Sequence, residues 1–344
     1  MIDTNVSLHD LQNLTAFQTS LTHGDFVART NELARNAVPF FFLVDFEKKF
    51  PLVWTMEEVM ESSIQFSTPN KSFPHITPQK LHQDLSLSIA PVRMHTYSSS
   101  FEKVKKHLLD GDSYLVNLTF PTTLHNDYSL EEIYQHAQAP FRLLCPNRFV
   151  TFSPETFIKI VEDQIFAYPM KGTIDASIPD AEEKILNNKK EEWEHNTIVD
   201  LLRNDLSMVA DQVAVTRFRY LDQIRTNHKD LLQVSSEIRG SLRSKWQERL
   251  GQILWDLLPA GSVSGAPKKK TLEIIRSSEI VPRGYYTGVF GYFDGTNLES
   301  AVNIRYIEAY ERGLRYRSGG GITASSTLQE EYQEMLDKIY VPTI

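Results

Sequence analysis

Residues 164–173 read Gln-Ile-Phe-Ala-Tyr-Pro-Met-Lys-Gly-Thr, a short apolar run that ends in a turn bounded by Pro169 and Gly172. Branched and aromatic side chains favour a strand over Gln164 to Ala167, and proline and glycine end it. Lys171 therefore stands on a turn directly after a strand. Such a turn holds an amine at a defined point with little cover, which suits a nucleophile, although an exposed lysine is most often only solvated.

Strands and turns of this kind recur along the chain and indicate the fold class. Runs rich in aromatic and β-branched residues predict strands over Pro39–Phe46, Ser113–Phe120, Phe149–Thr151, Phe157–Ala167, Val213–Tyr220, Tyr285–Phe293, Ser300–Ala309 and Leu314–Ser318. Helical patterns cover Phe101–Leu109, Leu130–Ala137, Ala181–Leu206, Trp246–Leu257, Pro267–Ser278 and Leu328–Tyr340. Because strands outnumber helices and do not alternate with them regularly, the sequence predicts an α+β fold rather than a doubly wound parallel sheet.

The composition is that of a globular protein with a substantial core. The chain has 344 residues, of which 41% are hydrophobic, and a formal net charge of -8. Because the net charge is negative, nucleic acid and an anionic membrane are not expected partners. No leader or membrane-length apolar run is visible, which predicts a cytoplasmic protein. The single cysteine, Cys145, excludes an internal disulfide and has the apolar neighbours of an inert core thiol.

The domain organisation is predicted from the distribution of prolines and from the lack of a linker. Residues 1–95 are interrupted by prolines and are interpreted as a shortened N-terminal covering segment. Residues 96–344 show no repeat, low-complexity tract or linker, so we expect one intertwined catalytic core there.

Two pairs of glutamates raise the possibility of a metal site. Glu191 and Glu194 stand three residues apart in one helical stretch, and Glu331 and Glu334 stand three apart in another, so each pair projects from one helical face. Mg²⁺ prefers carboxylate oxygens. The alternative is that both faces are solvated and form exposed salt bridges with nearby lysines, which is the usual state of such pairs.

Two glycine-rich segments have the composition of loops whose backbone amides bind anions. Residues 318–322 read Ser-Gly-Gly-Gly-Ile, which lets the backbone approach a carboxylate closely, although a tight turn explains the same pattern. Residues 259–268 form a small-residue loop that opens a helix. Neither has the glycine spacing and Gly-Lys-Ser/Thr ending of a nucleotide-binding loop, so ATP and GTP are not expected ligands.

Seven motifs in order resemble the chorismate-utilising enzymes, the family that includes anthranilate synthase component I, aminodeoxychorismate synthase component I, isochorismate synthase and salicylate synthase. The motifs are Ser153-Pro154-Glu155, Pro169-Met170-Lys171-Gly172-Thr173, Glu194-His195 with residues 199–206, the loop 261–268, Ile304-Arg305, Gly319-Gly320-Gly321-Ile322 and Glu331-Tyr332-Gln333-Glu334. The resemblance implies a large domain of packed, mostly antiparallel sheets flanked by helices, with a Mg²⁺-dependent site for chorismate.

The same resemblance implies roles for individual residues. Glu194 and Glu334 look like direct Mg²⁺ ligands, with Glu191 and Glu331 acting through metal-bound water. The catalytic residues would be Lys171, Glu155 and Thr173, with Glu155 as the general acid that protonates the departing C4 hydroxyl. The residues expected to bind the substrate are Arg305, Tyr292, Gly320, Gly321, Lys338 and Ser264.

Two positions discriminate among the branches of the family. Lys171 lies in a Pro-Met-Lys-Gly-Thr motif. This motif resembles the Pro-Ile-Lys-Gly-Thr of the aminodeoxychorismate synthases, whereas the anthranilate synthases carry an alanine at the lysine position, in Pro-Ile-Ala-Gly-Thr. In the former branch the lysine is thought to attack C2 of chorismate, and ammonia then adds at C4. Leu115 occupies the place where the isochorismate and salicylate enzymes carry a water-activating lysine, and leucine cannot be that base.

The resemblance therefore favours amination of chorismate to 4-amino-4-deoxychorismate, on the route to p-aminobenzoate and folate. The ammonia is expected from a separate glutamine amidotransferase subunit, because Cys145 lacks the sequence context of an amidotransferase nucleophile. Anthranilate synthase component I is the alternative activity. A non-catalytic relative that kept only the fold is disfavoured because all four glutamates are in place.

Overall fold

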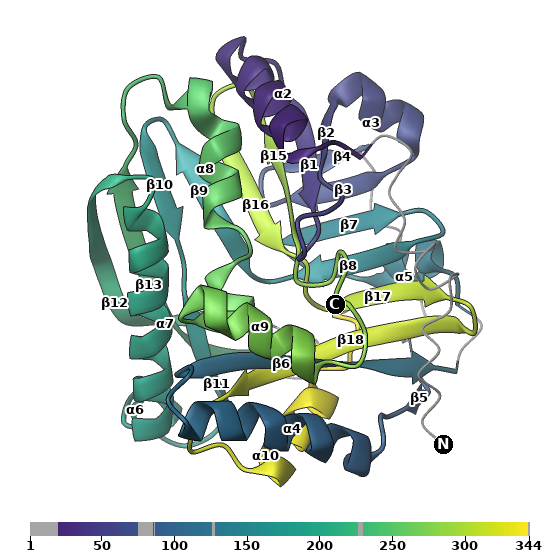
Figure 1. The fold of residues 1–344 in the computed structure, drawn as a ribbon, viewed down its shortest axis with the longest axis vertical. Coiled ribbons are helices and arrows are strands. Elements are labelled where there is room, and N and C mark those ends of the chain that lie inside the picture. Colours follow the sequence, from purple (N-terminus) through teal and green to yellow (C-terminus); the bar gives the residue numbers. More distant parts are fainter. Residues whose placement is uncertain (1–19, 75–84, 86, 126–127, 226–229, 343–344) are drawn as a thin grey trace.

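The computed structural model describes residues 20–74, 85, 87–125, 128–225 and 230–342. Positions 1–19, 75–84 and 86 of the N-terminal segment, and 126–127, 226–229 and 343–344 of the core, lie outside the described residues. Within the described ranges the chain forms two antiparallel sheets of nine strands each, flanked by helices (Figure 1). The predicted α+β class, with packed antiparallel sheets, is confirmed.

Sheet A consists of β1 (Phe40–Val44), β2 (Leu52–Thr55), β9 (Thr156–Val161), β10 (Gln164–Ala167), β11 (Met170–Asp175), β12 (Asp211–Arg225), β13 (Asp230–Ser241), β15 (Val289–Phe293) and β16 (Leu298–Val302). Its strand order is β11-β13-β10-β9-β16-β15-β1-β2, and β12 pairs with β13. The five residues of β1 are buried, and the strand lies between β15 and β2. Sheet A therefore joins strands from the N-terminal and C-terminal parts of the chain.

Sheet B consists of β3 (Gln65–Thr68), β4 (Lys71–Phe73), β5 (Ile89–Ala90), β6 (Leu115–Leu124), β7 (Phe141–Cys145), β8 (Phe149–Ser153), β14 (Gly265–Ala266), β17 (Tyr306–Tyr310) and β18 (Gly313–Ile322). Its strand order is β14-β6-β18-β17-β8-β7-β3-β4, and β5 pairs with β6. Because β3 and β4 belong to sheet B whereas β1 and β2 belong to sheet A, residues 40–73 contribute strands to both sheets.

The helices are α2 (His23–Arg35), α3 (Met56–Ser62), α4 (Met94–Leu109), α5 (Leu130–His136), α6 (Ala181–Leu186), α7 (Lys189–Ser207), α8 (Leu250–Leu257), α9 (Lys268–Ser278) and α10 (Leu328–Asp337), with short 3₁₀ turns η1 (Trp246–Arg249) and η2 (Gly261–Val263). Helices α4, α9 and α10 cover β6 and β18, and their contact buries one core cluster that includes Tyr97, Phe120, Ile275 and Met335. Helix α7 packs on the sheet A strands β11, β12 and β13. Among the described helices, none is both long and apolar enough to cross a bilayer.

Three segments that were each predicted as one element are broken in the structure. The predicted helix over 181–206 divides into α6 and α7 because Asn188 caps α7, its side-chain oxygen accepting from the amides of Lys190 (3.1 Å) and Glu191 (3.2 Å). The predicted strand over 157–167 is the hairpin β9–β10, which turns at Glu162 with φ 57°. The predicted strand over 300–309 divides into β16 and β17, which belong to different sheets.

Two of the places where the chain crosses between the sheets lie next to each other. Strand β8 of sheet B leads into β9 of sheet A, and β16 of sheet A leads into β17 of sheet B. Hydrogen bonds hold the two crossings together. The Phe152 amide of β8 donates to the Arg305 carbonyl, and the Val302 amide of β16 donates to the Glu155 carbonyl, each at 3.2 Å. This arrangement places Glu155 and Arg305 at the junction of the two sheets.

Candidate active site

Arg305 occupies the crossing from β16 to β17. Its backbone has φ 53°, a left-handed conformation that is uncommon outside glycine. The crossing is fixed by the Thr151 hydroxyl, which donates to the Ile304 carbonyl at 2.8 Å. The guanidinium carbon lies 4.9 Å from the centre of the Tyr340 ring, and the buried Nε has no acceptor among the described residues. A buried cation with an unused donor suits a ligand carboxylate.

Glu155 occupies the neighbouring crossing, from β8 to β9. Its carboxylate accepts a short hydrogen bond from the hydroxyl of Ser262 on the η2 turn. Burial raises the pKa of the Glu155 carboxyl, and that hydrogen bond together with the positive charges of Lys171, Arg305 and Lys338 opposes the rise without cancelling it. A carboxyl with a raised pKa, surrounded by three cationic side chains, is suited to donate a proton near neutral pH.

Lys171 extends from β11, the edge strand of sheet A, toward sheet B. The ladder with β13 is irregular between Lys171 and Thr173, and Gly172 there has φ +73°. The Lys171 amine lies 3.7 Å from a carboxylate oxygen of Glu194. A β-carbon placed on Gly321 of β18 would lie 3.7 Å from the same amine. Lys171 is 28% exposed, so its amine stands between the two sheets and is still accessible.

The two glutamate pairs belong to helices on either side of this junction. Glu191 and Glu194 lie on α7, and Glu331 and Glu334 lie on α10. Burial raises the pKa of Glu191, and repulsion from the Glu194 and Glu334 carboxylates adds to the rise. Burial also raises the pKa of Glu331, with further contributions from Glu334 and Glu194. The pairs therefore interact with each other electrostatically, although 137 or more positions separate them in the sequence.

The carboxylate oxygens have the chemistry that Mg²⁺ prefers, and one of them is unsatisfied. Glu331 accepts through Oε1 from the Ser326 hydroxyl at 2.6 Å, but its buried Oε2 has no hydrogen-bond partner among the described residues. Among the residues that the structure describes, no three His, Cys, Asp or Glu side chains converge tightly enough to enclose an ion. Instead, the amines of Lys171 and Lys338 lie against Glu194 and Glu334. The donor set fits a hard divalent cation that replaces these amines and takes up the free oxygen.

The run of glycines lies within a strand and not in a tight turn. Gly319, Gly320 and Gly321 pair with β6 near the end of β18. A β-carbon on Gly320 would lie 3.3 Å from Glu331 Oε2 and 3.4 Å from Glu334 Oε1. Glycine at this position therefore lets the carboxylates of α10 reach the backbone of sheet B.

Lys338, at the end of α10, ties this helix to the glycine strand. Its amine donates to the Gly319 carbonyl at 3.0 Å and to Glu334 Oε1 at 2.7 Å. Burial lowers the pKa of Lys338, and the positive charges of Lys171 and Arg305 also lower it, while Glu334 opposes them. Lys171, Arg305 and Lys338 thus converge on one small volume from three different elements.

Three residues predicted to act at the site, Thr173, Ser264 and Tyr292, do not join the cluster of Lys171, Arg305 and Lys338. The Thr173 side chain is exposed on β11. The fully buried Ser264 hydroxyl donates to the Ala260 carbonyl at 2.9 Å. Tyr292 packs against Phe66, with ring centres 5.7 Å apart, because its position on β15 faces an aromatic core cluster. Among the described residues, no hydrogen bond, ion pair or ring contact joins the side chains of Thr173, Ser264 or Tyr292 to that of Arg305 or Lys171.

Two residues that the sequence reasoning missed lie at the site. Ser262, and not Ser264, contacts Glu155, and both serines come from one small-residue loop whose sequence does not distinguish them. Tyr286, and not Tyr292, is the tyrosine of its segment that lies near Arg305. Burial raises the pKa of Tyr286 to about 12, against the effect of neighbouring guanidinium groups that include Arg305.

A family comparison agrees with this geometry. Residues 32–343 match the model of the chorismate binding enzymes. The chain belongs to this family. The match spans both sheets and every element that supplies a side chain to the junction, so the predicted resemblance is confirmed.

Individual relatives place the chain within the family. It is 48% identical over 92% of its length to an uncharacterized PabA-like protein of Pasteurella multocida, and it covers 98% of that protein. It is 32% identical over 71% of its length to aminodeoxychorismate synthase component 1 of Escherichia coli and covers 56% of that enzyme. It is 30% identical over 70% of its length to an anthranilate synthase component 1 of Haloarcula marismortui and covers 50% of that one. The chain thus spans about half the length of these two enzymes.

The fold also matches solved structures of the family. The menaquinone-specific isochorismate synthase MenF of Escherichia coli superposes with a TM-score of 0.69 over 93% of this chain and 82% of its own, at 17% identity. That likeness supports the fold alone.

Proposed function

We propose that this chain is an aminodeoxychorismate synthase component I, which converts chorismate and ammonia to 4-amino-4-deoxychorismate. The observation that carries the proposal is the position of the Lys171 amine, accessible at the junction of the sheets and 3.7 Å from both Glu194 Oε2 and the β-carbon position of Gly321. The junction gathers an amine, an acid and carboxylate-binding cations, which the proposed reaction needs.

Lys171 would act as a nucleophile in two steps. In the first, its neutral amine forms a bond to C2 of chorismate, both ring double bonds shift by one position, and the C4–oxygen bond breaks as the hydroxyl takes up a proton and leaves as water. In the second, ammonia forms a bond to C4 and gives up a proton, both double bonds shift back, and the bond between C2 and the lysine nitrogen breaks. Lys171 is thereby regenerated, and the net change replaces the C4 hydroxyl by an amino group with release of water.

Glu155 would supply the proton that lets the C4 hydroxyl leave as water. Its raised pKa favours the protonated carboxyl, which is the form that can donate. The Ser262 hydroxyl fixes the direction of the carboxyl. Donation leaves a carboxylate that the charges of Lys171, Arg305 and Lys338 stabilise.

Arg305 and Lys338 would bind the carboxylates of chorismate. Arg305 has an unused buried donor, and Lys338 stands beside the glycine strand. Glu191, Glu194, Glu331 and Glu334 would hold Mg²⁺, which when bound neutralises a substrate carboxylate and the repulsion within the glutamate group. Displacement of the Lys171 amine from Glu194 would then free it for the substrate.

Leu115 supports amination over hydration. Its side chain is buried, and Cδ1 lies 2.9 Å from the β-carbon position of Gly321, the same position that the Lys171 amine approaches. An apolar wall beside the nucleophile offers no base for activating water. The ammonia would come from a separate glutamine amidotransferase, the partner proposed for this chain.

Product identification tests the proposal. The purified chain is incubated with chorismate, Mg²⁺ and ammonium at mildly alkaline pH, and an aminodeoxychorismate lyase is then added. Formation of p-aminobenzoate, identified by mass and retention time, is the expected result. Formation of anthranilate would contradict it and favour the activity named for the Haloarcula relative.

A variant of Lys171 tests the covalent mechanism. Lys171→Met is expected to lower turnover on the order of a thousandfold or more, because the nucleophile is lost. Chorismate affinity should change by less than about tenfold, or about 1.4 kcal/mol. Lys190→Met is the matched control, since Lys190 is exposed and its charge, like that of Lys171, acts on Glu191 and Glu334. Equal effects of the two changes would exclude Lys171 as the nucleophile.

A further inference from the structure

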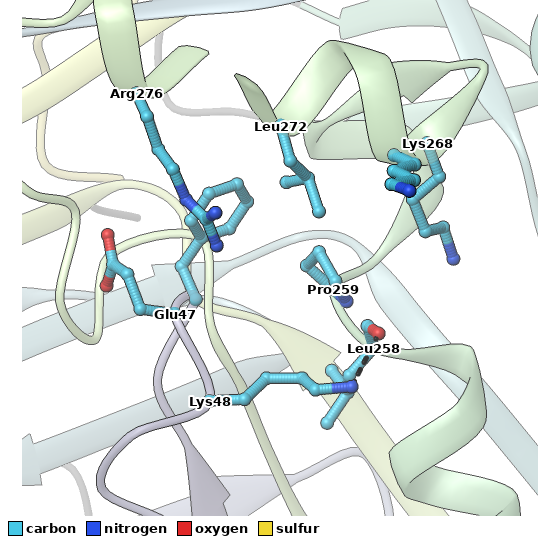
Figure 2. A pocket seen from close by; sticks show the side chains of 9 residues that line it. Glu47, Lys48, Leu258, Pro259, Lys268, Leu272 and Arg276 are labelled. Atoms are coloured by element: carbon cyan, nitrogen blue, oxygen red, sulfur yellow. Dashed lines mark hydrogen bonds between the residues drawn. The ribbon is translucent and has the colours of Figure 1, made fainter. Parts of the chain in front are cut away.

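A cavity of about 370 Å³ lies apart from the candidate active site. We call it the Lys48 pocket, and its lining residues are Phe46, Glu47, Lys48, Leu258, Pro259, Lys268, Lys269, Leu272 and Arg276. It opens between the segment after β1 and the start of α9, and it shares no lining residue with the site around Glu155 (Figure 2). Its volume falls within the range of roughly 300–1,000 Å³ that small-molecule sites occupy.

The inner wall of the Lys48 pocket is apolar and well supported. Phe46 is 5% exposed, Leu258 and Pro259 are buried, and Leu272 lies between them and the solvent-facing side of α9. The guanidinium of the fully buried Arg283 lies 4.3 Å from the centre of the Phe46 ring. This wall offers a fixed apolar surface to the body of a ligand.

The rim is strongly cationic, which is unusual for a chain with a net charge of -8. Four of the nine lining residues are Lys or Arg, and one is acidic. Figure 2 shows the amines of Lys48 and Lys268 at one end and Arg276 with Glu47 at the other. The single acidic residue, Glu47, accepts from the backbone amides of Arg283 and Gly284, each at 3.0 Å, and its one negative charge cannot balance four positive ones.

Most of these cations have no anionic partner. Lys268 is paired with Asp205 at 3.0 Å. The Lys48 amine donates to two neutral carbonyls, those of Trp255 (3.0 Å) and Leu258 (3.1 Å). Lys269 and Arg276 form no ion pair within the described part of the chain.

Lys48 in particular is held where its charge is unfavourable. Burial and, to a smaller extent, the nearby charge of Lys268 together lower its pKa to about 8, against the opposing effect of Asp256. An anion in the pocket would relieve this repulsion.

We propose that the Lys48 pocket binds a small organic anion, a carboxylate carried on an apolar body about the size of a single ring. The apolar wall of Phe46, Pro259 and Leu272 takes the body, and the positive charges of Lys48, Lys269 and Arg276 attract the carboxylate. A bare inorganic anion would leave the apolar wall uncovered, and a neutral ring would leave the cations uncompensated.

The pocket also has a structural connection to the catalytic loop. Leu258, Pro259 and Lys268 stand at the two ends of the loop whose middle residue Ser262 donates to Glu155. Lys268 pairs with Asp205, and the Asp205 carboxylate lies within 2.8 Å of the β-carbon position of Gly261. A ligand in the pocket therefore touches the outer side of the loop that serves the acid.

Calorimetric titration with benzoate tests the proposal, with benzamide and inorganic phosphate as uncharged and non-apolar comparisons. Benzoate is expected to bind saturably, and both comparisons are expected to bind at least about tenfold more weakly. Lys269→Gln with Arg276→Gln should weaken benzoate at least about tenfold. The matched control, Lys103→Gln with Arg312→Gln, removes the same charge from two exposed residues outside the pocket and should leave binding unchanged.

Two further variants keep the result decisive. Lys48→Met should also weaken benzoate, but Lys48 holds the end of α8 and its loss can disturb folding, so the rim variant carries the test. The titrations are made in the Arg305→Gln background, because Arg305 is proposed to bind carboxylates in the candidate active site and this change removes binding of benzoate there. Absence of benzoate binding in that background, equal binding of benzamide or phosphate, or an unchanged affinity in the rim variant would each overturn the assignment.

Discussion

The hydrogen bond from Ser262 to Glu155 allows a quantitative test of Glu155 as the general acid. Burial raises the pKa of Glu155, and this hydrogen bond is the largest effect that opposes the rise. The acid has to be protonated to act, so turnover should fall as the pH rises through the pKa of Glu155. Ser262→Ala removes a donor that favours the ionised form. The pKa should therefore rise, and activity should persist to higher pH.

The size of the effect follows from the charge on the acceptor. A hydrogen bond to an ionised group contributes about 1.5–3 kcal/mol. One pH unit corresponds to about 1.4 kcal/mol of difference between the two protonation states. Because the protonated carboxyl can keep part of the interaction with Ser262, the difference between the states is at the lower end of that range. We expect the alkaline limb of the profile to move up by about one pH unit.

The assay is the pH dependence of turnover at saturating chorismate, Mg²⁺ and ammonium. Ser264→Ala is a matched control from the same loop, because the Ser264 hydroxyl donates to the Ala260 carbonyl and does not contact Glu155. It should leave the alkaline limb in place. If Ser262→Ala leaves the limb where it is, or moves it to lower pH, Glu155 is not the group whose protonation limits the reaction.

Three other changes test the packing and the proposed metal site. Arg283→Ala should lower the free energy of unfolding, measured in urea, by about 3–5 kcal/mol, because it leaves the buried Glu279 carboxylate, 2.7 Å away, without its partner. Arg243→Ala breaks an exposed ion pair with Asp211 and should change that free energy little; equal losses would contradict this reasoning. Glu331→Gln should weaken Mg²⁺ binding at least about tenfold by calorimetry, whereas Glu330→Gln on the exposed side of α10 should not; equal affinities would remove Glu331 from the metal site. Gly172→Ala should lower the free energy of unfolding by about 1–2 kcal/mol, since φ is +73°, and an unchanged urea midpoint would be the contrary result.

Local patterns identified most elements but not where they break. The strand over 300–309 was predicted as one element because branched and aromatic residues occur on both sides of Arg305, and no proline or glycine marks the break; Arg305 itself takes a left-handed backbone conformation there. The long strand β13 was not predicted at all. Its sequence mixes polar and apolar residues without clean alternation: it reads Asp-Leu-Leu-Gln-Val-Ser-Ser-Glu-Ile-Arg-Gly-Ser. The strand is held by pairing with β10, β11 and β12, which a local pattern does not reveal.

Motifs predicted which residues meet at the junction of the sheets more reliably than single residue types did. Lys171, Glu155 and Arg305 could be named because each sits in a short motif with proline, glycine or an apolar flank. Tyr286 and Tyr292 stand in one predicted strand, and no local signal indicates which of them faces the junction. The Lys48 pocket could not be predicted, because its lining comes from segments more than 200 positions apart.

The sequence by itself determined the α+β class and the helical state of the two glutamate pairs, because these depend on periodicity within a few residues, whereas the turn predicted at Lys171 is part of strand β11 in the structure. Only the tertiary structure decided that the glutamates of α7 and α10 come close enough to interact and that Glu155 and Arg305 meet where the chain changes sheets. These contacts depend on strand pairing between distant segments, which is set by the burial of whole sheet faces rather than by any local pattern.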